Sequence, residues 1–332
     1  MEGIILFALS LCTLGAIYAI LCLALNFECG IGGLWDLGIV SYFGIGAYTY
    51  VLLTAPAADG HQEYVLGLGL PMWVGMLCAG VVSGLAAFLI ALPSLRLKRE
   101  YFLITTIAFA EVLRQIFMNE TWLTNGVAGI YGLKQPFQGF VEPLNYPYVL
   151  FSIVITALVA TYIAVTRMSQ GAFGRSLKAI RENEALAVTA GIDVKRYNMR
   201  AYIAAGTIAG FAGVLYVWYN TLLLPAQISA DITFFIWTAI IIGGIGNNAG
   251  ALVGGFIFIL LHDLLRFAPV SGETAVALSS LRTAVVGMAL IMILRWRPRG
   301  LLPEKARTFA DPKPKGDGSF TGAHILNGGF DA

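Results

Sequence analysis

Four charged or amide side chains in a row, Arg181 to Glu184, form the most suggestive chemical group in this sequence. They lie in a polar segment, Arg167–Arg200, between two long apolar runs. Within it, Gly174–Gly191 predicts a short amphipathic helix that could dock into a groove on a partner protein. A solvated connector is the plain alternative. The residues assigned to docking are Gly174, Arg175, Leu177, Ile180, Arg181, Glu182, Glu184 and Gly191, with Ala187 and Val188 extending the apolar stripe.

A second candidate, Gly244 to Ala249, matches a dinucleotide-binding fingerprint by residue type. That fingerprint needs a strand, a turn and a helix in a soluble domain, whereas both flanks here are apolar enough for a membrane. We therefore predict a break between two half-helices, in which Asn247 and Asn248 satisfy freed backbone groups. Such breaks lie near substrates or gates in transporters, and a purely structural turn is the alternative.

Asn26–Gly38 contains four glycines and is predicted to be a second broken corner of the same kind. The two corners together supply the residues expected to line a path or act as hinges. These are Asn26, Gly33, Asp36, Gly38, Gly243, Gly244, Gly246 and Asn247.

Patterns that would indicate an enzyme or a metal site are missing from the sequence. It has no Gly-x4-Gly-Lys-Ser/Thr loop for nucleotide phosphates, no HExxH and no GxSxG. The four cysteines form no CxxC pair, and the three histidines are not at ligand spacing. We predict that the chain is not an enzyme and that it binds no cofactor or metal itself.

Charged side chains inside the apolar runs are few, and Glu111 and Arg114 are the clearest pair. Their spacing of three places them on one face of a helix. Charges within a membrane are costly and often functional, although an internally paired, structural role is the simpler interpretation here.

The composition determines the broad class. The 332 residues are 58% hydrophobic and only 12% charged, whereas a soluble domain carries about 25% charged residues. We predict an all-α integral membrane protein with about nine transmembrane or half-membrane helices and Gly-rich broken corners. The predicted spans are 4–26, 36–54, 65–92, 100–118, 147–166, 198–219, 232–247, 250–267 and 280–294.

Most of the 21 Lys and Arg residues lie in three segments, Arg96–Arg99, Arg167–Arg200 and Arg295–Lys315. Short basic segments remain cytoplasmic, so the span count predicts an N-terminus outside and a C-terminus inside. The segments expected outside are Ala55–Tyr64, Asn119–Tyr146, Asn220–Asp231 and Ala268–Ser279.

Two regions are expected: a membrane domain, 1–303, which contains a cytoplasmic segment at 167–197, and a disordered tail, 304–332. Within the membrane domain, glycines recur four residues apart and predict close helix packing. These pairs are Gly80/Gly84, Gly206/Gly210 and Gly250/Gly254.

Over about residues 10–305 the chain resembles the permease subunits of branched-chain amino-acid ABC importers, in particular the M type of the two paired permeases. The resemblance rests on motifs that are specific together and weak singly. They are Ala24-Leu25-Asn26, Gly33-Leu34-Trp35-Asp36-Leu37-Gly38, Phe43-Gly44-Ile45-Gly46-Ala47-Tyr48, Tyr101-Phe102, Thr105, Ala108-Phe109, Leu123-Thr124-Asn125-Gly126, Gly129-Ile130, Arg181-Glu182-Asn183-Glu184, Ala190-Gly191-Ile192, Gly243-Gly244-Ile245-Gly246 and Arg297-Pro298-Arg299-Gly300-Leu301.

This resemblance implies a multi-pass protein of a prokaryotic inner membrane, without nucleic-acid partners. It implies a second homologous permease, two cytoplasmic ATP-binding subunits that carry ATP and Mg, and a substrate-binding protein outside. The docking segment would then couple ATP hydrolysis to transport of branched-chain or other neutral amino acids.

Two departures from the family pattern widen the range of solutes. The chain has Trp35-Asp36-Leu37-Gly38 where the family commonly has Asn-Phe-Gly, and Thr124-Asn125-Gly126 where it commonly has Thr-Gly-Gly. A permease for urea or short amides is therefore an alternative. An ion-coupled secondary transporter that uses Glu111 or Asp36, and a membrane scaffold or receptor, are alternatives of other classes.

Overall fold

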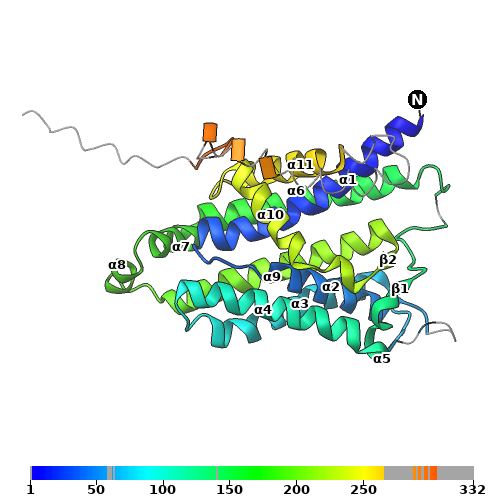
Figure 1. Cartoon of the computed structure of the whole chain (residues 1–332), viewed down its shortest axis with the longest axis horizontal. Helices are drawn as coiled ribbons and strands as arrows, with labels where there is room; N and C mark the ends of the chain where they lie inside the picture. The colour runs from blue at the N-terminus through cyan, green and yellow to red at the C-terminus, as the bar shows by residue number, and fades with distance from the viewer. Residues whose placement is uncertain are drawn as a thin grey trace, which may run out of the picture.

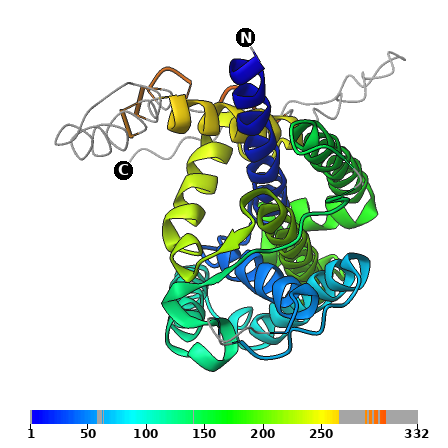
Figure 2. The ribbon, with the colours of Figure 1, turned by 90° about the vertical axis from the view of Figure 1, so that its right-hand side faces the viewer.

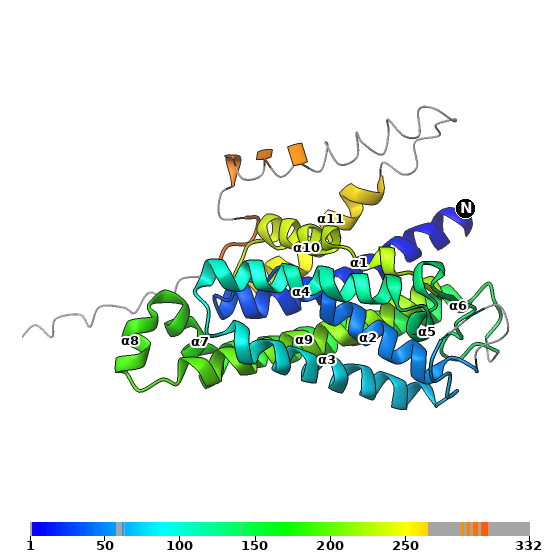
Figure 3. The same ribbon diagram turned by 60° about the horizontal axis from the view of Figure 1, so that its bottom comes forward.

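A computed structural model describes residues 2–57, 62, 64–139, 141–264, 287–288, 291–292, 295–297 and 300–304. In this part of the chain the protein is a helical bundle whose long helices run close to its longest axis (Figure 1; Figure 3). The helices are α1 (Glu2–Leu25), α2 (Ile39–Thr54), α3 (Met72–Ser94), α4 (Arg99–Asn119), α5 (Thr121–Thr124), α6 (Tyr146–Gln170), α7 (Ala172–Glu182), α8 (Glu184–Thr189), α9 (Val194–Asn220), α10 (Ala230–Gly243) and α11 (Asn248–Leu264). Short pieces complete it: the π-helix η1 (Asn26–Ile31), the 3-10 turns η2 (Gly126–Ala128) and η3 (Pro225–Gln227), and the strands β1 (Ile130–Tyr131) and β2 (Leu222–Leu223).

Six helices in the described residues are long and apolar enough to cross a membrane. They correspond to α1 with η1, α3, α4, α6, α9, and α10 with η3, while α2 and α11 are shorter apolar helices. The all-α membrane class predicted from composition is therefore confirmed. The count of nine is not, because most of the ninth predicted span, 280–294, lies outside the described residues.

Two helix starts differ from the sequence prediction. The second predicted span begins at residue 36, but α2 begins at Ile39 after an extended segment. The third begins at residue 65, but α3 begins at Met72, because Gly67 and Gly69 have positive φ and Pro71 precedes the helix. Hydropathy marks how far the apolar run extends, whereas backbone conformation determines where the helix begins.

The long helix α9 lies at the centre of the bundle and packs against α1, α2 and α3 (Figure 2). Small side chains allow these close approaches. A Cβ added to Gly206 would lie 2.7 Å from Cβ of Ala87, and one added to Gly84 would lie 2.6 Å from Oγ1 of Thr207. The packing role predicted for these glycine pairs is thus confirmed. In lipid the hydrophobic effect does not drive helices together, so close van der Waals contact must stabilise their packing.

The bundle has two distinct ends (Figure 1). At one, which we call the strand end, β1 pairs with β2 in antiparallel fashion and Tyr64 bridges to Thr124. This pairing brings together three of the four segments predicted to share one side of the membrane; the fourth, Ala268–Ser279, lies outside the described residues. The N-terminus is also at this end (Figure 1).

The other end, which we call the loop end, carries α7 and α8 (Figure 1). Arg99, Arg181 and Lys195 line one cavity here, so the first two basic segments meet as predicted. The third basic segment reaches the same end, because the Leu301 N–H donates to the carbonyl of Ile242 near the end of α10 (2.9 Å).

Candidate functional site: a junction of two broken helices

Both predicted broken corners exist, and they meet at the loop end of the bundle. The first is η1 together with the extended segment 32–38, and the second is the turn 244–247 between α10 and α11. The fully buried Asn26 joins them. Its Oδ1 accepts a hydrogen bond from the Gly246 N–H (2.8 Å), and its Nδ2 donates to Oδ1 of Asn248 (3.1 Å). One amide side chain therefore satisfies polar groups from both halves of the junction.

A third helix joins this network through Asn248. Its Nδ2 donates to Oγ of Ser169 (3.1 Å) and to Oγ1 of Thr166 (3.3 Å), both near the end of α6. Buried side-chain amides are stable in an apolar bundle only when partners satisfy them, so these contacts define a single arrangement of α1, α6 and α11.

The backbones of the two broken corners can approach each other closely only because glycines occupy the positions where they meet. Gly246 has φ +85°, and a Cβ placed there would lie 2.5 Å from Oε2 of Glu304. A Cβ on Gly30 would lie 2.6 Å from the backbone nitrogen of Gly246. Backbone approaches backbone at this point, and a larger side chain would separate the two corners.

Arg181 connects the predicted docking segment to the junction. It donates from Nη1 to the carbonyl of Gly30 and from Nη2 to Oε2 of Glu304 (2.9 Å). Lys178, one turn earlier on α7, donates to Oε1 of the same carboxylate (2.6 Å). The Arg181 side chain also packs beside Gly33, where an added Cβ would lie 2.8 Å from its Cγ. A movement of α7 would therefore pull directly on the first corner.

The segment that contains Glu304 caps the second corner. Backbone N–H groups of Leu301 and Leu302 donate to the carbonyls of Ile242 and Gly243 (2.9 Å each), which end α10. Asn247 donates from Nδ2 to the carbonyl of Leu302 (3.0 Å) and accepts from the Ala249 N–H (3.0 Å). Leu301 and Leu302 thus satisfy carbonyls at the end of α10, and Asn247 satisfies an N–H at the start of α11, as predicted for Asn247. Glu304 was predicted to begin the tail, whereas these contacts hold it against the membrane domain; residues 305–332 lie outside the described residues.

Asp36 and Gly38, also predicted for this site, lie in the extended segment that leads to α2. Asp36 is fully buried, accepts from the Gly38 N–H at Oδ1 (2.8 Å), and its backbone carbonyl accepts from Nε1 of Trp237 (2.8 Å). The ring of Trp35 packs between Trp237 and the guanidinium of Arg99, at 5.5 Å from each. This segment therefore fixes α10 and α4 to the first corner.

The part of the predicted apolar stripe that lies on α7 faces the helical bundle. Leu177 is fully buried against a cluster that includes Phe27 and Val165, and Ile180 is also buried. Leu177 and Ile180 thus anchor α7 to the bundle and do not face outward. Of the residues assigned to docking, Gly174 is buried as well, while Arg175, Glu182, Glu184 and Gly191 are exposed.

The apolar side chains that face outward come from α8. Leu186 is 65% exposed and Val188 57% exposed, beside the exposed Glu184. Val188 belongs to the predicted stripe, but Leu186 was missed, because the α7 periodicity does not continue through Asn183. Asn183 instead caps α8, accepting from the Leu186 N–H at Oδ1 (3.1 Å).

Glu111 and Arg114 are paired with each other, as the simpler interpretation predicts. Arg114 donates from Nε to Oε2 of Glu111 (2.9 Å), and Gln115 donates to Oε1 (3.0 Å). The pair lies on the outer face of α4, away from the junction. Among the described residues, no three His, Cys, Asp or Glu side chains come together as a metal site would need.

Other residues of this site were not predicted from the sequence. Glu28 is as deeply buried as Asp36. Lys178, Ser169 and Glu304 were not predicted either. Each has an ordinary sequence context, and only long-range contacts bring them to the junction.

Apolar helices that break in pairs and meet at the break, with a charged surface segment bonded to it, are features of multi-pass membrane transporters. The profile of the family described as branched-chain amino acid transport system, permease component, matches residues 7–294, and the chain belongs to that family. It is a permease subunit of the ABC importer class.

Relatives support this assignment across most of the chain. The high-affinity branched-chain amino acid permease protein LivM of Salmonella typhimurium is 26% identical over 89% of this chain and 70% of its own length. The probable LivM of Methanocaldococcus jannaschii is 28% identical over 83% of this chain and 81% of its own length. A probable LivH permease of the same archaeon is 28% identical over 69% of this chain and 72% of its own. None of the solved structures matches the chain significantly.

Proposed function

We propose that this chain imports branched-chain amino acids, forming the translocation path together with a second, homologous permease. The names of the relatives give the solute class, and matches to both LivM and LivH types support a paired arrangement. Two ATP-binding subunits, which carry ATP and Mg, would dock at the loop end, which we place in the cytoplasm. A substrate-binding protein would deliver the solute at the strand end.

The observation that carries the coupling mechanism is the contact set of Arg181. This side chain joins α7 to Gly30 in one broken corner and, through Glu304, to Gly246 in the other. When the ATP-binding subunits close on α8, α7 would move with it and shift both corners together. The path would thereby switch between inward- and outward-facing forms, because helices at a packed junction move as units.

The direct test is reconstitution of the chain with its three kinds of partner in liposomes. We expect leucine uptake that requires ATP inside and the binding protein outside, with much slower uptake of urea. Uptake that continues without ATP while an ion gradient is present would favour the ion-coupled alternative. Faster transport of urea than of leucine would overturn the solute assignment while leaving the ABC mechanism intact.

The buried carboxyl groups sharpen this test, because an ion-coupled carrier needs an acid in its path. Asp36→Asn retains the acceptor for the Gly38 N–H, and Glu28→Gln retains the side-chain shape. We expect both variants to keep ATP-driven uptake, and a proton ionophore to leave uptake unchanged when ATP is supplied. Loss of uptake on addition of the ionophore would contradict ATP as the sole energy source.

A further inference from the structure

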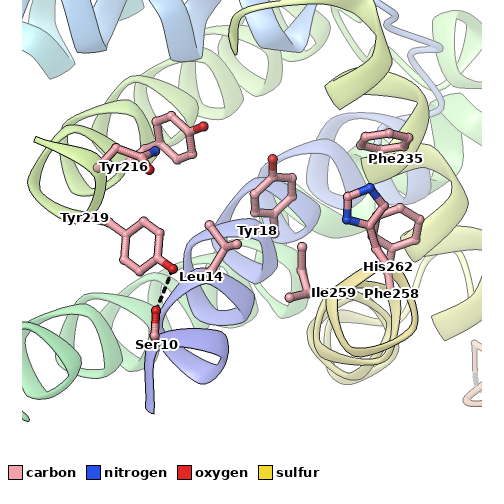
Figure 4. Close-up of a pocket in the computed structure, with 10 residues that line it drawn as sticks. Ser10, Leu14, Tyr18, Tyr216, Tyr219, Phe235, Phe258, Ile259 and His262 are labelled. Atoms are coloured by element: carbon pink, nitrogen blue, oxygen red, sulfur yellow. Dashed lines mark hydrogen bonds between the residues drawn. The ribbon is translucent and has the colours of Figure 1, made fainter. Parts of the chain in front are cut away.

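A cavity of about 520 Å³ lies between α1, α9, α10 and α11, toward the strand end of the bundle (Figure 4). Its volume is in the range of about 300–1,000 Å³ that is usual for small-molecule sites. It is separate from the junction, since Tyr18 on its wall precedes Asn26 by two turns of α1, about 12 Å. At the junction, hydrogen bonds join Asn26 to Gly246 and Asn248.

One side of the cavity carries hydroxyl groups. Ser10 and Tyr219 are hydrogen-bonded to each other through their hydroxyls (2.7 Å), and Tyr216 lies next to them on α9 (Figure 4). On α1, Ser10, Leu14 and Tyr18 recur every four residues and therefore share the face that lines the cavity. These neutral groups can donate and accept hydrogen bonds without fixing a net charge.

The opposite side is aromatic. Phe235 from α10 packs against Phe258 from α11 with ring centroids 5.3 Å apart, and the ring of His262 stacks on Phe258 at 5.7 Å (Figure 4). Flat apolar surfaces of this kind bind aliphatic groups by burial and dispersion. The cavity is thus amphipathic, with hydroxyls toward α9 and rings toward α11.

We propose that this cavity is a transit site for a neutral amino acid with a branched aliphatic side chain. The side chain would lie against Phe235 and Phe258, and the zwitterionic head would lie at the hydroxyls of Tyr216 and Tyr219. In the described part of the chain, no Asp, Glu, Lys or Arg lines the cavity, which suits a solute without net charge. Hydroxyl contacts hold a zwitterion less firmly than ion pairs do, as transit requires.

This inference rests on the proposed function and narrows the range of solutes that the cavity would accept. Urea and short amides have no aliphatic part to cover the rings, so the cavity favours amino acids over them. Burial of one aliphatic side chain against the rings would raise the affinity roughly tenfold or more above that for glycine.

The test is photo-crosslinking on the complete reconstituted transporter during ATP-driven uptake, with a diazirine analogue of leucine as the probe. We expect labelled peptides that contain Tyr18, Phe235 or Phe258. Excess leucine should remove the label and excess urea should not. Label at other helices while leucine uptake continues would overturn the cavity and leave the proposed function standing. Label that leucine does not displace would show a lipid-like occupant and also overturn it, whereas a complex with no leucine uptake would overturn both.

A matched pair of variants gives a second readout. Leu14→Trp adds bulk to the cavity wall, and we expect leucine uptake to fall about tenfold while alanine uptake falls less, because the smaller solute needs less room. Ile5→Trp is the control, since Ile5 lies on the same helix and is 52% exposed on the outside of the bundle. Equal loss of both solutes in Leu14→Trp would contradict a cavity that selects by side-chain size.

Discussion

The guanidinium of Arg181 binds groups within this chain, and its two partners cannot be held equally well by an ammonium group. A planar fork can donate at once to the Gly30 carbonyl and to Glu304, whereas a lysine offers a single point charge. We expect Arg181→Lys to reduce ATP-driven leucine uptake by about tenfold or more, although the charge is kept, because small misplacements at a coupling point are amplified. Uptake per unit of reconstituted protein measures this effect.

The control for that variant is Arg196→Lys. Arg196 forms an exposed pair with Asp193 (3.6 Å), and exposed pairs contribute little to stability. We expect uptake to be unchanged in the control. Normal uptake in Arg181→Lys would mean that the junction tolerates the loss of its fork, and the coupling proposal would then fail.

Gly246 tests whether close approach of the two corners is needed. Gly246→Ala places a Cβ near Glu304 and in a left-handed conformation that costs about 1–2 kcal/mol. Gly132→Ala is matched, because Gly132 also has positive φ (+73°) but its added Cβ meets nothing within 4 Å. We expect both variants to lower the melting temperature of the purified protein, and only Gly246→Ala to abolish uptake. Similar uptake in the two variants would show that backbone strain alone accounts for the effect.

For single residues, the sequence predicts those contacts that are local in the chain. Glu111 and Arg114 are three residues apart on one helix, and Asn247 caps a helix break that the neighbouring glycines predict. In contrast, Arg181 and Glu304 are separated by 123 positions, and Asn26 and Gly246 by 220. No periodicity reports a contact over such distances, so the direction in which Arg181 points could not be predicted.

Helix α7 anchors this segment to the bundle, whereas α8 is expected to dock the partner subunit. Leu177 on α7 is buried in the bundle, whereas Leu186 and Val188 on α8 are exposed apolar side chains at the loop end. Exposed apolar groups ringed by charges are typical of a surface that a partner covers. The docking surface is therefore expected on α8, one short helix further along the chain than the periodicity of α7 suggests.

Two substitutions separate these roles. Leu186→Asp should leave the purified permease intact but reduce the amount of ATP-binding subunit that co-purifies with it. Leu177→Asp should reduce the yield of folded permease itself, because an unpaired charge would be buried. Retention of the ATP-binding subunits by Leu186→Asp, and also by Glu184→Lys, would move the docking surface away from α8.

Among the elements, long apolar helices were predictable because about 20 apolar residues in succession match the thickness of a bilayer and are rare in soluble folds. The strands β1 and β2 were not, since each has two residues and neither shows a periodic pattern. Their pairing joins two loops that lie over 90 positions apart in sequence, and it forms only because the bundle brings these loops together. The predicted helix starts were too early for a related reason, because apolar residues also occupy the non-helical segments that precede α2 and α3.

For the whole molecule, the arrangement of the two ends predicts which side of the membrane each faces. Three basic segments gather at the loop end, and short basic segments remain cytoplasmic. Cysteine substitutions can test this orientation, because Leu186 at the loop end and Leu144 at the strand end are 65% and 63% exposed. The background should carry Cys12→Ser and Cys78→Ser, since the other two cysteines are buried.

We expect a membrane-impermeant maleimide to label Leu144→Cys in intact, outer-membrane-permeabilised cells. It should label Leu186→Cys only after the inner membrane is opened. The same experiment tests the transport route, because a binding protein outside can deliver solute only to the strand end, toward which the cavity between α1, α9, α10 and α11 lies. Labelling of Leu186→Cys from outside would show that the protein is inserted in the opposite orientation. The Arg181 junction would then lie away from any cytoplasmic ATPase, and the coupling mechanism proposed for it would be excluded.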